Sequence, residues 1–436
     1  MNRKQRIAVV GAGISGLASA WLLSRRYDVT LFEAGSYLGG HTNTVDVTLE
    51  GKTHPVDTGF LVFNEKTYPN LIAMFAELGV DSVATEMSFA VSLENPDLEW
   101  AGSNLATVFG QKRNLLRPSF WAMLRDILRF NRESAAWLAS PPGGQCSLRE
   151  FLLQGRYSSA FSDWYLLPMA AAIWSCPTGQ MLDMPLATFV RFCQNHGLLQ
   201  IFDRPMWRTV KGGGREYVQK IAAQLSDIRL GCEVQAVMRA SGGLRVIHAG
   251  GEEQFDQVVM ACHSDQSRDI LGFTASDAQR SMLAAIRYQP NRAVLHTDPA
   301  LLPRDEKLWS AWNYFAGRGE PGDQPVGVSY LINRLQPLPF KTPVVVTLNP
   351  AREPDPARVL AEFDYAHPIF DGPAIAAQQM LASVQGQGGI WLAGAWGSYG
   401  FHEDGLNSAL RVANGMGVRA PWQPEQPGLV RQLEAA

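Results

Sequence analysis

The chain of 436 residues is long enough for two or three domains, and with 46% hydrophobic and 18% charged residues it has the composition of a globular protein. A formal net charge of -3 gives no overall attraction to a polyanion, so we expect no nucleic acid partner. The five cysteines include no CxxC pair and no zinc-like spacing, which indicates free thiols, no metal site and a cytoplasmic location.

The first predicted element is a strand over residues 7–10, followed by a glycine-rich turn and a helix that ends near residue 26. A second strand over residues 29–32 leads into Glu33, which lies 20 residues after Gly13. This spacing is typical of a dinucleotide site, where glycines admit the pyrophosphate, the helix N-terminus binds it and the acid accepts the ribose hydroxyls. The predicted contacts are Gly11, Gly13, Ile14, Ser15, Gly16, Glu33 and Ala34.

Two further glycine motifs follow, over residues 39–42 and 57–59. A flavin dinucleotide that lies extended needs several close backbone approaches, whereas a nicotinamide dinucleotide has no need of this second pair. We therefore expect FAD. The additional predicted contacts are Gly39, Gly40, His41, Thr42, Asp57, Thr58 and Gly59.

Together with the glycines at 212–214 and the segment GIWLAGAWGSYGFHEDGLNSA at 389–409, these motifs resemble the flavin-containing amine oxidase superfamily. That superfamily also holds the protoporphyrinogen oxidases and carotenoid desaturases, and the chain looks most like its bacterial branch of predicted NAD/FAD-binding proteins. The resemblance implies an α/β fold, with a discontinuous Rossmann-like FAD-binding domain and an inserted α+β substrate domain. The FAD-binding domain would comprise residues 1–82, 206–275 and 386–420, the substrate domain 83–205 and 276–385, and a C-terminal tail 421–436.

The resemblance also implies cofactor contacts in the later segments, with Val234 at the adenine and the start of the last helix at the flavin pyrimidine ring. The remaining predicted contacts are Gly394, Ala395, Gly405 and Leu406. A helix N-terminus at that place would stabilise the anionic reduced flavin. Ala395 stands where many relatives have an acid, and His41 stands where relatives often have Arg, so its charge would depend on pH.

The candidate catalytic residues precede the last helix, where the chain has to pass the flavin. His402 or Glu403 would act as a general base or orient the substrate, although acids there also stabilise a helix N-terminus. Tyr399 with His402 forms half of the aromatic sandwich of amine oxidases. Lys341 is the candidate for the lysine that amine oxidases bond through water to flavin N5, and its alternative is an exposed lysine at a strand edge.

The predicted substrate domain is aromatic and aliphatic, and residues 119–138 have helix spacing. Arg125, Arg129 and Arg132 fall on an arc opposite its apolar face. This helix either packs on its domain with a solvated outer face, or docks on an anionic membrane surface at the inner face of the membrane. The cations just upstream that would assist docking are Lys112, Arg113 and Arg117.

Together, these patterns and the resemblance predict an FAD-dependent oxidoreductase that takes a hydride from a C–H bond of an apolar substrate. The favoured substrate is a lipid, acyl or polyene chain that is dehydrogenated to an alkene. The alternatives are an amine that is oxidised to an imine, and an FAD-binding redox module without turnover. Since the chain has one GxGxxG, we expect electrons to leave to oxygen, a quinone or a carrier rather than to a nicotinamide nucleotide.

Overall fold

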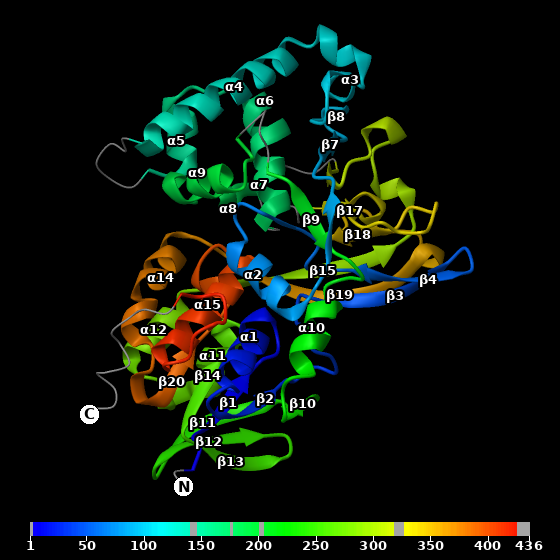
Figure 1. The fold of residues 1–436 in the computed structure, drawn as a ribbon. Coiled ribbons are helices and arrows are strands. Elements are labelled where there is room, and N and C mark those ends of the chain that lie inside the picture. Colours follow the sequence, from blue (N-terminus) through cyan, green and yellow to red (C-terminus); the bar gives the residue numbers. More distant parts are fainter. Residues whose placement is uncertain (1–2, 140–145, 175–177, 200–204, 318–326, 425–436) are drawn as a thin grey trace.

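A computed structural model describes residues 3–139, 146–174, 178–199, 205–317 and 327–424 of the chain. The predicted C-terminal tail lies mostly outside these ranges, because residues 425–436 are not described. The molecule has two halves, one built on a five-stranded sheet and the other on a seven-stranded sheet (Figure 1). We call them the flavin half and the substrate half.

The flavin half is organised by a wholly parallel sheet whose strands come from distant parts of the chain. Its spatial order is β10 (Ile228–Arg229), β2 (Asp28–Phe32), β1 (Arg6–Val10), β14 (Gln257–Met260) and β20 (Ile390–Leu392). The strands are short apolar runs, as is typical of a parallel sheet that is covered on both faces. The expected α/β fold is confirmed.

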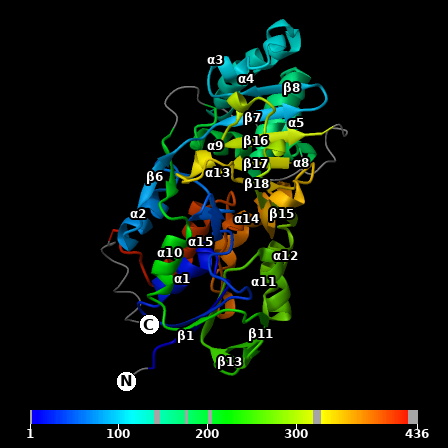
Figure 2. The same cartoon turned by 90° about the vertical axis from the view of Figure 1, so that its right-hand side faces the viewer.

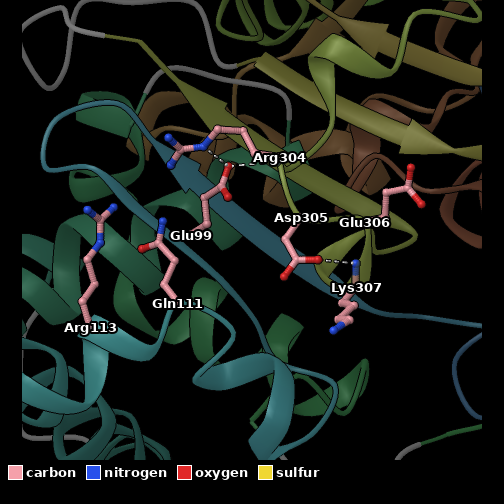
Figure 3. A pocket seen from close by; sticks show the side chains of 7 residues that line it. All are labelled: Glu99, Gln111, Arg113, Arg304, Asp305, Glu306 and Lys307. Atoms are coloured by element: carbon pink, nitrogen blue, oxygen red, sulfur yellow. Dashed lines mark hydrogen bonds and ion pairs between the residues drawn. The ribbon is translucent and has the colours of Figure 1, made fainter.

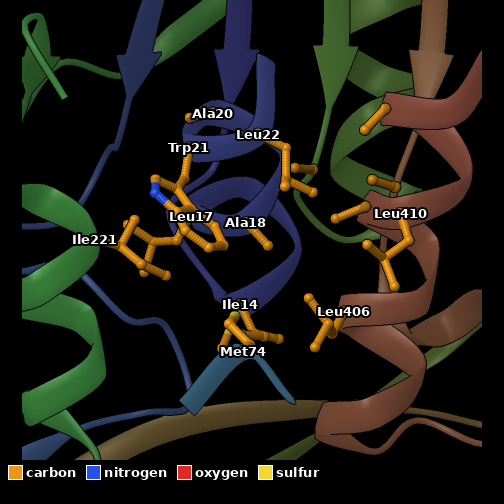
Figure 4. Close-up of a cluster of buried hydrophobic side chains, with 14 of the residues drawn as sticks. Ile14, Leu17, Ala18, Ala20, Trp21, Leu22, Met74, Ile221, Leu406 and Leu410 are labelled. Atoms are coloured by element: carbon orange, nitrogen blue, oxygen red, sulfur yellow. The ribbon is translucent and has the colours of Figure 1, made fainter. Parts of the chain in front are cut away.

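Helices cover one face of this sheet and surround a central helix, α1 (Ile14–Leu23), which is buried along its whole length. Around it lie α2 (Pro69–Leu78), α10 (Arg215–Ala222) and α15 (His402–Gly415). Figure 4 shows the contact, with Leu17 and Trp21 of α1 facing Ile221 of α10 on one side and Leu406 and Leu410 of α15 on the other. An α-helix that is apolar all round is stable only when it is enclosed in this way.

The opposite face of the parallel sheet carries a second core. It is covered by an antiparallel meander of β11 (Val234–Ala240), β12 (Gly243–His248) and β13 (Gly251–Phe255). Three helices complete the cover, namely α11 (Ser264–Leu271), α12 (Asp277–Ala284) and α14 (Gly372–Val384).

The substrate half is built on a mixed sheet, in which β16 and β7 are parallel and the other neighbours antiparallel. Its order is β19 (Val359–Pro368), β15 (Tyr288–His296), β18 (Val345–Leu348), β17 (Gly327–Leu331), β16 (Trp312–Ala316), β7 (Phe89–Leu93) and β8 (Leu98–Ala101). The helix expected at 119–138 is confirmed as α4 (Pro118–Ala139).

The other helices beside this sheet are short. They are α3 (Leu105–Val108), α5 (Leu148–Gln154), α6 (Ser159–Phe161), α7 (Leu167–Trp174), α8 (Thr178–Leu182) and α9 (Leu186–Asn195), with a 3-10 turn η1 (Lys112–Leu116) before α4. Figures 1 and 2 both place α3 and α4 at the end of the molecule farthest from β13. Within the described ranges, no helix has the length and hydropathy needed to cross a membrane.

Small elements join the two halves. A hairpin of β3 (Thr44–Leu49) and β4 (Lys52–Asp57) leaves the flavin half, and a three-stranded sheet contains β5 (Phe63–Asn64), β9 (Trp207–Val210) and β6 (Ser82–Thr85). The short helix α13 (Ile332–Leu335) packs against this junction, and the side chain that follows it, Gln336, bonds to Asp57.

Candidate active site

The turn between β1 and α1 is fixed by backbone contacts at its glycines. Gly11 has a φ of +98°, and a Cβ atom at Gly16 would lie 1.8 Å from the Gly11 carbonyl oxygen, so both positions require glycine. A Cβ atom at Gly13, in contrast, would meet no protein atom within 4 Å. Because Gly13 borders open space at the start of α1, it is the glycine that leaves room for a ligand.

Glu33 lies beside this turn at the end of β2. Its carboxylate accepts hydrogen bonds from the Ala12 N–H at 2.7 Å and from the Gly35 N–H at 2.8 Å. A carboxylate has about four acceptor positions, so about two remain for further donors such as sugar hydroxyls. Ala34, the next residue, is exposed.

The second glycine pair packs directly on the first turn. The Gly39 N–H donates to the Ala12 carbonyl at 2.9 Å, and a Cβ atom at Gly40 would lie 3.1 Å from the Cα atom of Gly13. A Cβ atom at Gly59 would lie 2.2 Å from the His41 carbonyl oxygen. Three segments that are separate in the sequence therefore form one continuous backbone surface beside the start of α1, which we call the glycine surface.

The starts of α1 and α15 also meet at this place. The Ser15 hydroxyl donates to the Gly405 carbonyl at 3.0 Å, and a Cβ atom at Gly405 would lie 2.6 Å from Ile14. The side chains of Ile14 and Ser15, which were expected to contact the cofactor, are thus used in helix packing, and Leu406 is fully buried in the same core. Both helices direct their N-terminal ends, where negative charge is stabilised, toward the same region.

His402, the first residue of α15, is held by three contacts. Its ring stacks on Phe60 with centroids 3.6 Å apart, and its Nε2 lies 2.8 Å from the Thr42 hydroxyl and 3.0 Å from the Tyr217 hydroxyl. Burial lowers the pKa of His402 to about 3. The imidazole is therefore neutral near pH 7 and a weak base, so of the two expected roles the geometry favours orientation over proton abstraction.

Glu403 does not face the site. Its two oxygens accept hydrogen bonds from the N–H groups of Asn70 at 3.0 Å and Leu71 at 2.9 Å, and from the Asn70 side chain. These groups lie in the first turn of α2, where backbone N–H groups have no helical partner. Burial raises the pKa of Glu403, although these hydrogen bonds act to lower it. The predicted catalytic role is corrected to that of a carboxylate that caps α2.

Asp57 and Thr58 also have structural partners. The Asp57 carboxylate accepts from the Thr44 hydroxyl at 2.5 Å, the Gly214 N–H at 2.9 Å and the Gln336 amide at 2.9 Å. Burial raises the pKa of Asp57 to about 6, although these hydrogen bonds oppose the shift. Thr58 bonds to the Tyr365 hydroxyl at 2.8 Å. These two side chains join the flavin half to the substrate half, and the expected contact of the two residues with the cofactor stays a prediction.

Lys341 lies apart from the residues described so far. Its backbone N–H donates to the Glu50 carboxylate at 3.0 Å, next to the tip of the hairpin of β3 and β4, and its side chain is exposed. The predicted contact with flavin N5 is therefore corrected in favour of the alternative, an exposed surface lysine.

Tyr399 belongs to a group of rings between α9 and the start of α15, which we call the aromatic wall. The Phe192 ring lies 4.0 Å from His196, 4.9 Å from Phe401 and 5.8 Å from Tyr399, measured between centroids. Trp174 of α7 lies 4.5 Å from Phe192. Burial lowers the pKa of His196 to about 4 and raises that of Tyr399.

Three histidines from different elements gather beside the glycine surface. The His41 ring lies 5.1 Å from His367, 6.2 Å from His263 and 4.9 Å from Tyr365. Burial first, and then His367, His263 and His402, lower the pKa of His41 well below its usual range. Its charge is thus not expected to change near pH 6.5, and it does not supply the positive charge of the arginine that it replaces.

Sequence reasoning missed several of these partners. Tyr217, Tyr365 and His367 were not singled out, and Tyr217 lies on α10 just after the glycines at 212–214. Tyr365 and His367 are two residues apart on β19 and therefore share one face of that strand. That spacing was the available signal, but nothing local to β19 indicates that its partner is His41.

The other expected contacts lie at the margins of the site. Val234 is buried with Phe32 in the core on the opposite face of the sheet. The Gly394 N–H donates to Ser408 at 2.9 Å, and a Cβ atom at Gly394 would overlap the Trp396 indole at 2.0 Å. Ala395 is half-buried and is 3.7 Å from the position of a Cβ atom at Gly405, so it borders the start of α15.

These observations fit a dinucleotide cofactor. The start of α1 has no side-chain cap, the space beside Gly13 is open, and Glu33 keeps free acceptor positions. The His41 Nε2 atom is buried without a hydrogen-bond partner. A bound group that carries hydroxyls and phosphates would satisfy these donors and acceptors. Among the described residues, no three His, Cys, Asp or Glu side chains are arranged to hold a metal ion.

An open hollow of about 720 Å³ lies elsewhere, at the outer end of the substrate half (Figure 3). Its two arginines are paired within the protein, Arg304 with Glu99 at 3.2 Å and Arg113 with Asp97, and Asp305 accepts from the Lys307 backbone N–H at 3.0 Å. We therefore do not assign the active site to this hollow.

Comparison with known proteins agrees with the geometry. The family model for flavin containing amine oxidoreductases matches residues 14–320. The chain is 29% identical to the carotenoid phi-ring synthase of Chlorobaculum tepidum over 174 residues, which are 38% of this chain and 24% of that protein. The chain thus spans about a quarter of the length of that relative.

Two solved structures share the fold over nearly the full length. A fatty acid isomerase from P. acnes that produces CLA has a TM-score of 0.68 and 15% identity, covering 96% of this chain and 100% of that chain. Cyclohexylamine oxidase from Brevibacterium oxydans has a TM-score of 0.65 and 16% identity, covering 95% of this chain and 100% of that chain. With its glycine surface, Glu33 and the family match over most of its length, the chain belongs to the family of flavin-containing amine oxidoreductases.

Proposed function

We propose that the protein takes a hydride from a C–H bond of an apolar chain, and that this chain is a lipid acyl or polyene chain that becomes an alkene as the neighbouring carbon loses a proton, so that both hydrogens pass to the bound FAD. The observation that carries the proposal is the aromatic wall beside the start of α15. Phe192 is 2% exposed and contacts His196, Tyr399 and Phe401. Flat apolar rings offer a long hydrocarbon extensive contact and no hydrogen-bonding groups that it would leave unsatisfied.

The electrostatics of the wall support a neutral substrate. His196 and His402 are both held neutral, because burial lowers their pKa values to about 4 and about 3. The two acids in the first turn of α15 bind backbone groups, Glu403 at α2 and Asp404 at the Phe401 N–H at 3.0 Å. An ammonium ion brought to this wall would lose its hydration, and the nearest acids already accept backbone hydrogen bonds, which makes its binding costly.

Bound FAD supplies the two-electron acceptor for a hydride from carbon. The residues of the chain orient and enclose the substrate: His402 is fixed by Thr42, Tyr217 and Phe60, and the wall keeps water from the reacting bond. The N-terminal dipole of α15 stabilises negative charge at its end. For the electrons we propose oxygen, a quinone or a carrier as acceptor, since the sequence has one GxGxxG motif.

The fold comparisons support both the favoured substrate and its competitor. One protein with this fold is a fatty acid isomerase, and a relative in sequence is a carotenoid ring synthase. Their names refer to a fatty acid and to a carotenoid. Cyclohexylamine oxidase and the family description favour an amine instead. The neutral wall leads us to prefer the hydrocarbon.

Anaerobic mixing of the FAD-loaded protein with lipids or with amines distinguishes these functions. We expect detergent-dispersed unsaturated lipids to bleach the absorbance of the oxidised flavin, and amines to leave it unchanged. Bleaching by amines alone would replace the proposal with amine oxidation. Absence of bleaching by either class would favour an FAD-binding module without turnover.

A charge placed in the wall sharpens the test. His196→Asp would introduce a carboxylate between Phe192 and Phe401, and we expect roughly tenfold slower bleaching by lipids. His54→Asp, on the hairpin strand β4, is the matched control and should bleach at the wild-type rate. Faster reduction of His196→Asp by amines than by lipids would show that the charge of the wall selects the substrate, whereas unchanged lipid bleaching would remove the wall from the substrate path.

A further inference from the structure

We propose that the outer end of the substrate half docks on the surface of an anionic lipid bilayer. The docking surface, which we call the outer patch, consists of Leu105, Leu115, Leu116, Trp121 and Leu128. Its use rests on the proposed function, because docking would allow an acyl chain to be taken from the bilayer. Its geometry does not depend on that function.

The outer patch concentrates exposed apolar side chains. Five of the thirteen exposed large hydrophobic residues in the described part of the chain lie between residues 105 and 128. Leu116 is 87% exposed, Leu105 78%, Leu128 59% and Trp121 50%. Exposed apolar side chains scattered singly are normal, but a contiguous group of this kind marks an interaction surface.

The patch is held in one arrangement by contacts within it. The Trp121 indole donates to the Leu115 carbonyl at 2.9 Å, and the Trp121 ring lies 5.2 Å from Phe109. The Phe109 N–H in turn donates to the Leu105 carbonyl at 3.2 Å. Segments α3, η1 and the start of α4 thus present their apolar side chains from one connected structure, and a tryptophan with one polar edge is typical of a membrane interface.

The exposed face of α4 continues the patch with cations. Its exposed residues are Pro118, Ser119, Trp121, Arg125, Leu128, Arg132, Ala136 and Ala139. At 100° per residue, Trp121, Arg125, Leu128 and Arg132 lie within an arc of about 60°. Apolar residues and arginines therefore alternate along one stripe, and the stripe holds no acid.

The two acids of this region lie beside the stripe: Asp126 is 3.3 Å from Arg125 and Glu133 is 3.9 Å from Arg132, and both arginine side chains stay mostly exposed. Asp126 is fully buried and accepts from the Ser158 N–H at 2.9 Å, and Glu133 accepts from the Tyr157 hydroxyl at 2.6 Å. Arg129, expected on the outer face, is turned toward Gly155, whose carbonyl it contacts at 2.7 Å. Residues 105–139 contain six cations and two acids, a net charge of +4 in a chain of net charge -3. This charge complements an anionic lipid surface, whereas it would repel the same patch on a second copy of the chain.

The inner face of α4 belongs to the core of the substrate half. Phe120, Met123 and Phe130 are fully buried, and Phe130 packs with Phe161 and Phe189. One helix therefore contacts the apolar interior on one side and would contact the bilayer on the other. Figures 1 and 2 show α3 and α4 at the extremity of the molecule, where the flavin half does not block approach to a flat surface.

Sedimentation of the full FAD-loaded chain with vesicles tests the proposal. We expect binding to vesicles that contain phosphatidylglycerol with phosphatidylcholine, weaker binding at high salt, and little binding to pure phosphatidylcholine. Leu115→Asp combined with Leu116→Asp should weaken partition roughly tenfold or more, because it removes the two adjacent leucines. Arg125→Glu combined with Arg132→Glu should also weaken it roughly tenfold.

Matched controls carry the same changes outside the patch. Phe273→Asp alters a 96% exposed ring in the flavin half, and Arg3→Glu combined with Lys4→Glu makes the same charge change near the N-terminus. Both should bind as the wild type does. Equal loss in the controls, or no binding to anionic vesicles, would overturn the proposal. So would a wild-type oligomer that dissociates when the two leucines are changed, since the patch would then be an interface between copies of the chain.

The same variants separate this proposal from the proposed function. Patch variants should keep wild-type flavin bleaching by detergent-dispersed lipid and lose bleaching by lipid in vesicles. If dispersed lipid fails to bleach any form while the vesicles still bind, the substrate assignment fails and the docking surface stands. If lipid in detergent and lipid in vesicles bleach the flavin of the patch variants equally, docking has no part in substrate supply and the inference is wrong.

Discussion

Glycines hold the flavin half together at its site, whereas aromatic rings fill the interior of the substrate half. At Gly16 and Gly59, one backbone segment lies directly on another, with no room for a Cβ atom. In the substrate half, Phe130, Phe161 and Phe192 instead contact several neighbouring rings each. The first kind of contact accepts one residue type, and the second accepts any set of side chains that fills the same volume.

This difference explains why the two halves differ in how much of their function can be inferred. A backbone contact that requires glycine leaves a fixed spacing in the sequence, and the spacing identifies the cofactor class. A ring cluster leaves only an aromatic composition, so the substrate has to be inferred from the wall itself.

The largest effect on stability and FAD retention is expected from two single alanine substitutions, made separately in the first glycine turn. Gly16→Ala would place a Cβ atom 1.8 Å from the Gly11 carbonyl oxygen, and should cost about 3 kcal/mol of unfolding free energy together with the bound FAD. Gly13→Ala meets no protein atom within 4 Å, so the apoprotein should keep its stability within about 1 kcal/mol while FAD retention falls. Chemical unfolding measures the stability, and the ratio of flavin to protein absorbance measures the retained FAD. Equal destabilisation by the two changes would contradict the distinct roles.

Acid should destabilise the packing at the start of α15. The folded-state pKa of His402, about 3, lies below its ordinary value of 6.5, so the folded protein binds fewer protons than the unfolded chain between these values. Its contribution to stability is complete above pH 6.5 and is lost as pH falls toward 3. His402→Gln should therefore reduce the loss of unfolding free energy between pH 6.5 and 4 by about 3 kcal/mol. An unchanged pH dependence would show that the imidazole is not buried in a neutral form.

Asp57 should act with the opposite sign. Its folded-state pKa of about 6 lies above the ordinary value of 3.8, so the folded protein binds more protons in that window and gains stability as pH falls through it. This gain partly offsets the loss from the histidines. Asp57→Asn removes it, and denaturant unfolding at several pH values should show a loss that is steeper than wild type by about 2 kcal/mol.

A smaller effect on stability is expected at Glu403, the neighbour of His402. Glu403→Ala removes the acceptor for the Asn70 and Leu71 N–H groups, and should cost about 1–2 kcal/mol while the rate of flavin reduction by substrate stays unchanged. Glu77→Ala, an exposed acid in the last turn of the same helix, is the control and should change stability by less than about 0.5 kcal/mol. A large loss of reduction rate in Glu403→Ala would restore the catalytic role.

The smallest effect is expected at Lys341. Its side chain is exposed, and its backbone N–H makes the contact with Glu50. Lys341→Met should therefore leave both the flavin reduction rate and the unfolding free energy within about 0.5 kcal/mol of wild type. Stopped-flow reduction would detect a lysine that acts at flavin N5 as a marked slowing.

Local patterns predicted the parts of the site in which neighbours in sequence are neighbours in space. The strand, turn and helix around Gly13, and the helix of residues 118–139, follow from glycine spacing and apolar periodicity. The different contacts of His402 and Glu403 could not be predicted from local patterns. Adjacent residues on a helix face different directions, and the partners of these two come from α10 and α2. Likewise, nothing near Asp57 in the sequence indicated that Gln336, far along the chain, is one of its partners.

The sequence by itself determined the cofactor class, because a backbone that has to approach phosphates closely permits only glycine and so leaves a readable spacing at Gly11, Gly13 and Gly16. Tertiary structure alone decided which polar side chains remain available for chemistry. Each buried donor or acceptor must find a partner, and for Glu33, His41 and His402 those partners, or their absence, depend on segments brought together only when the chain folds.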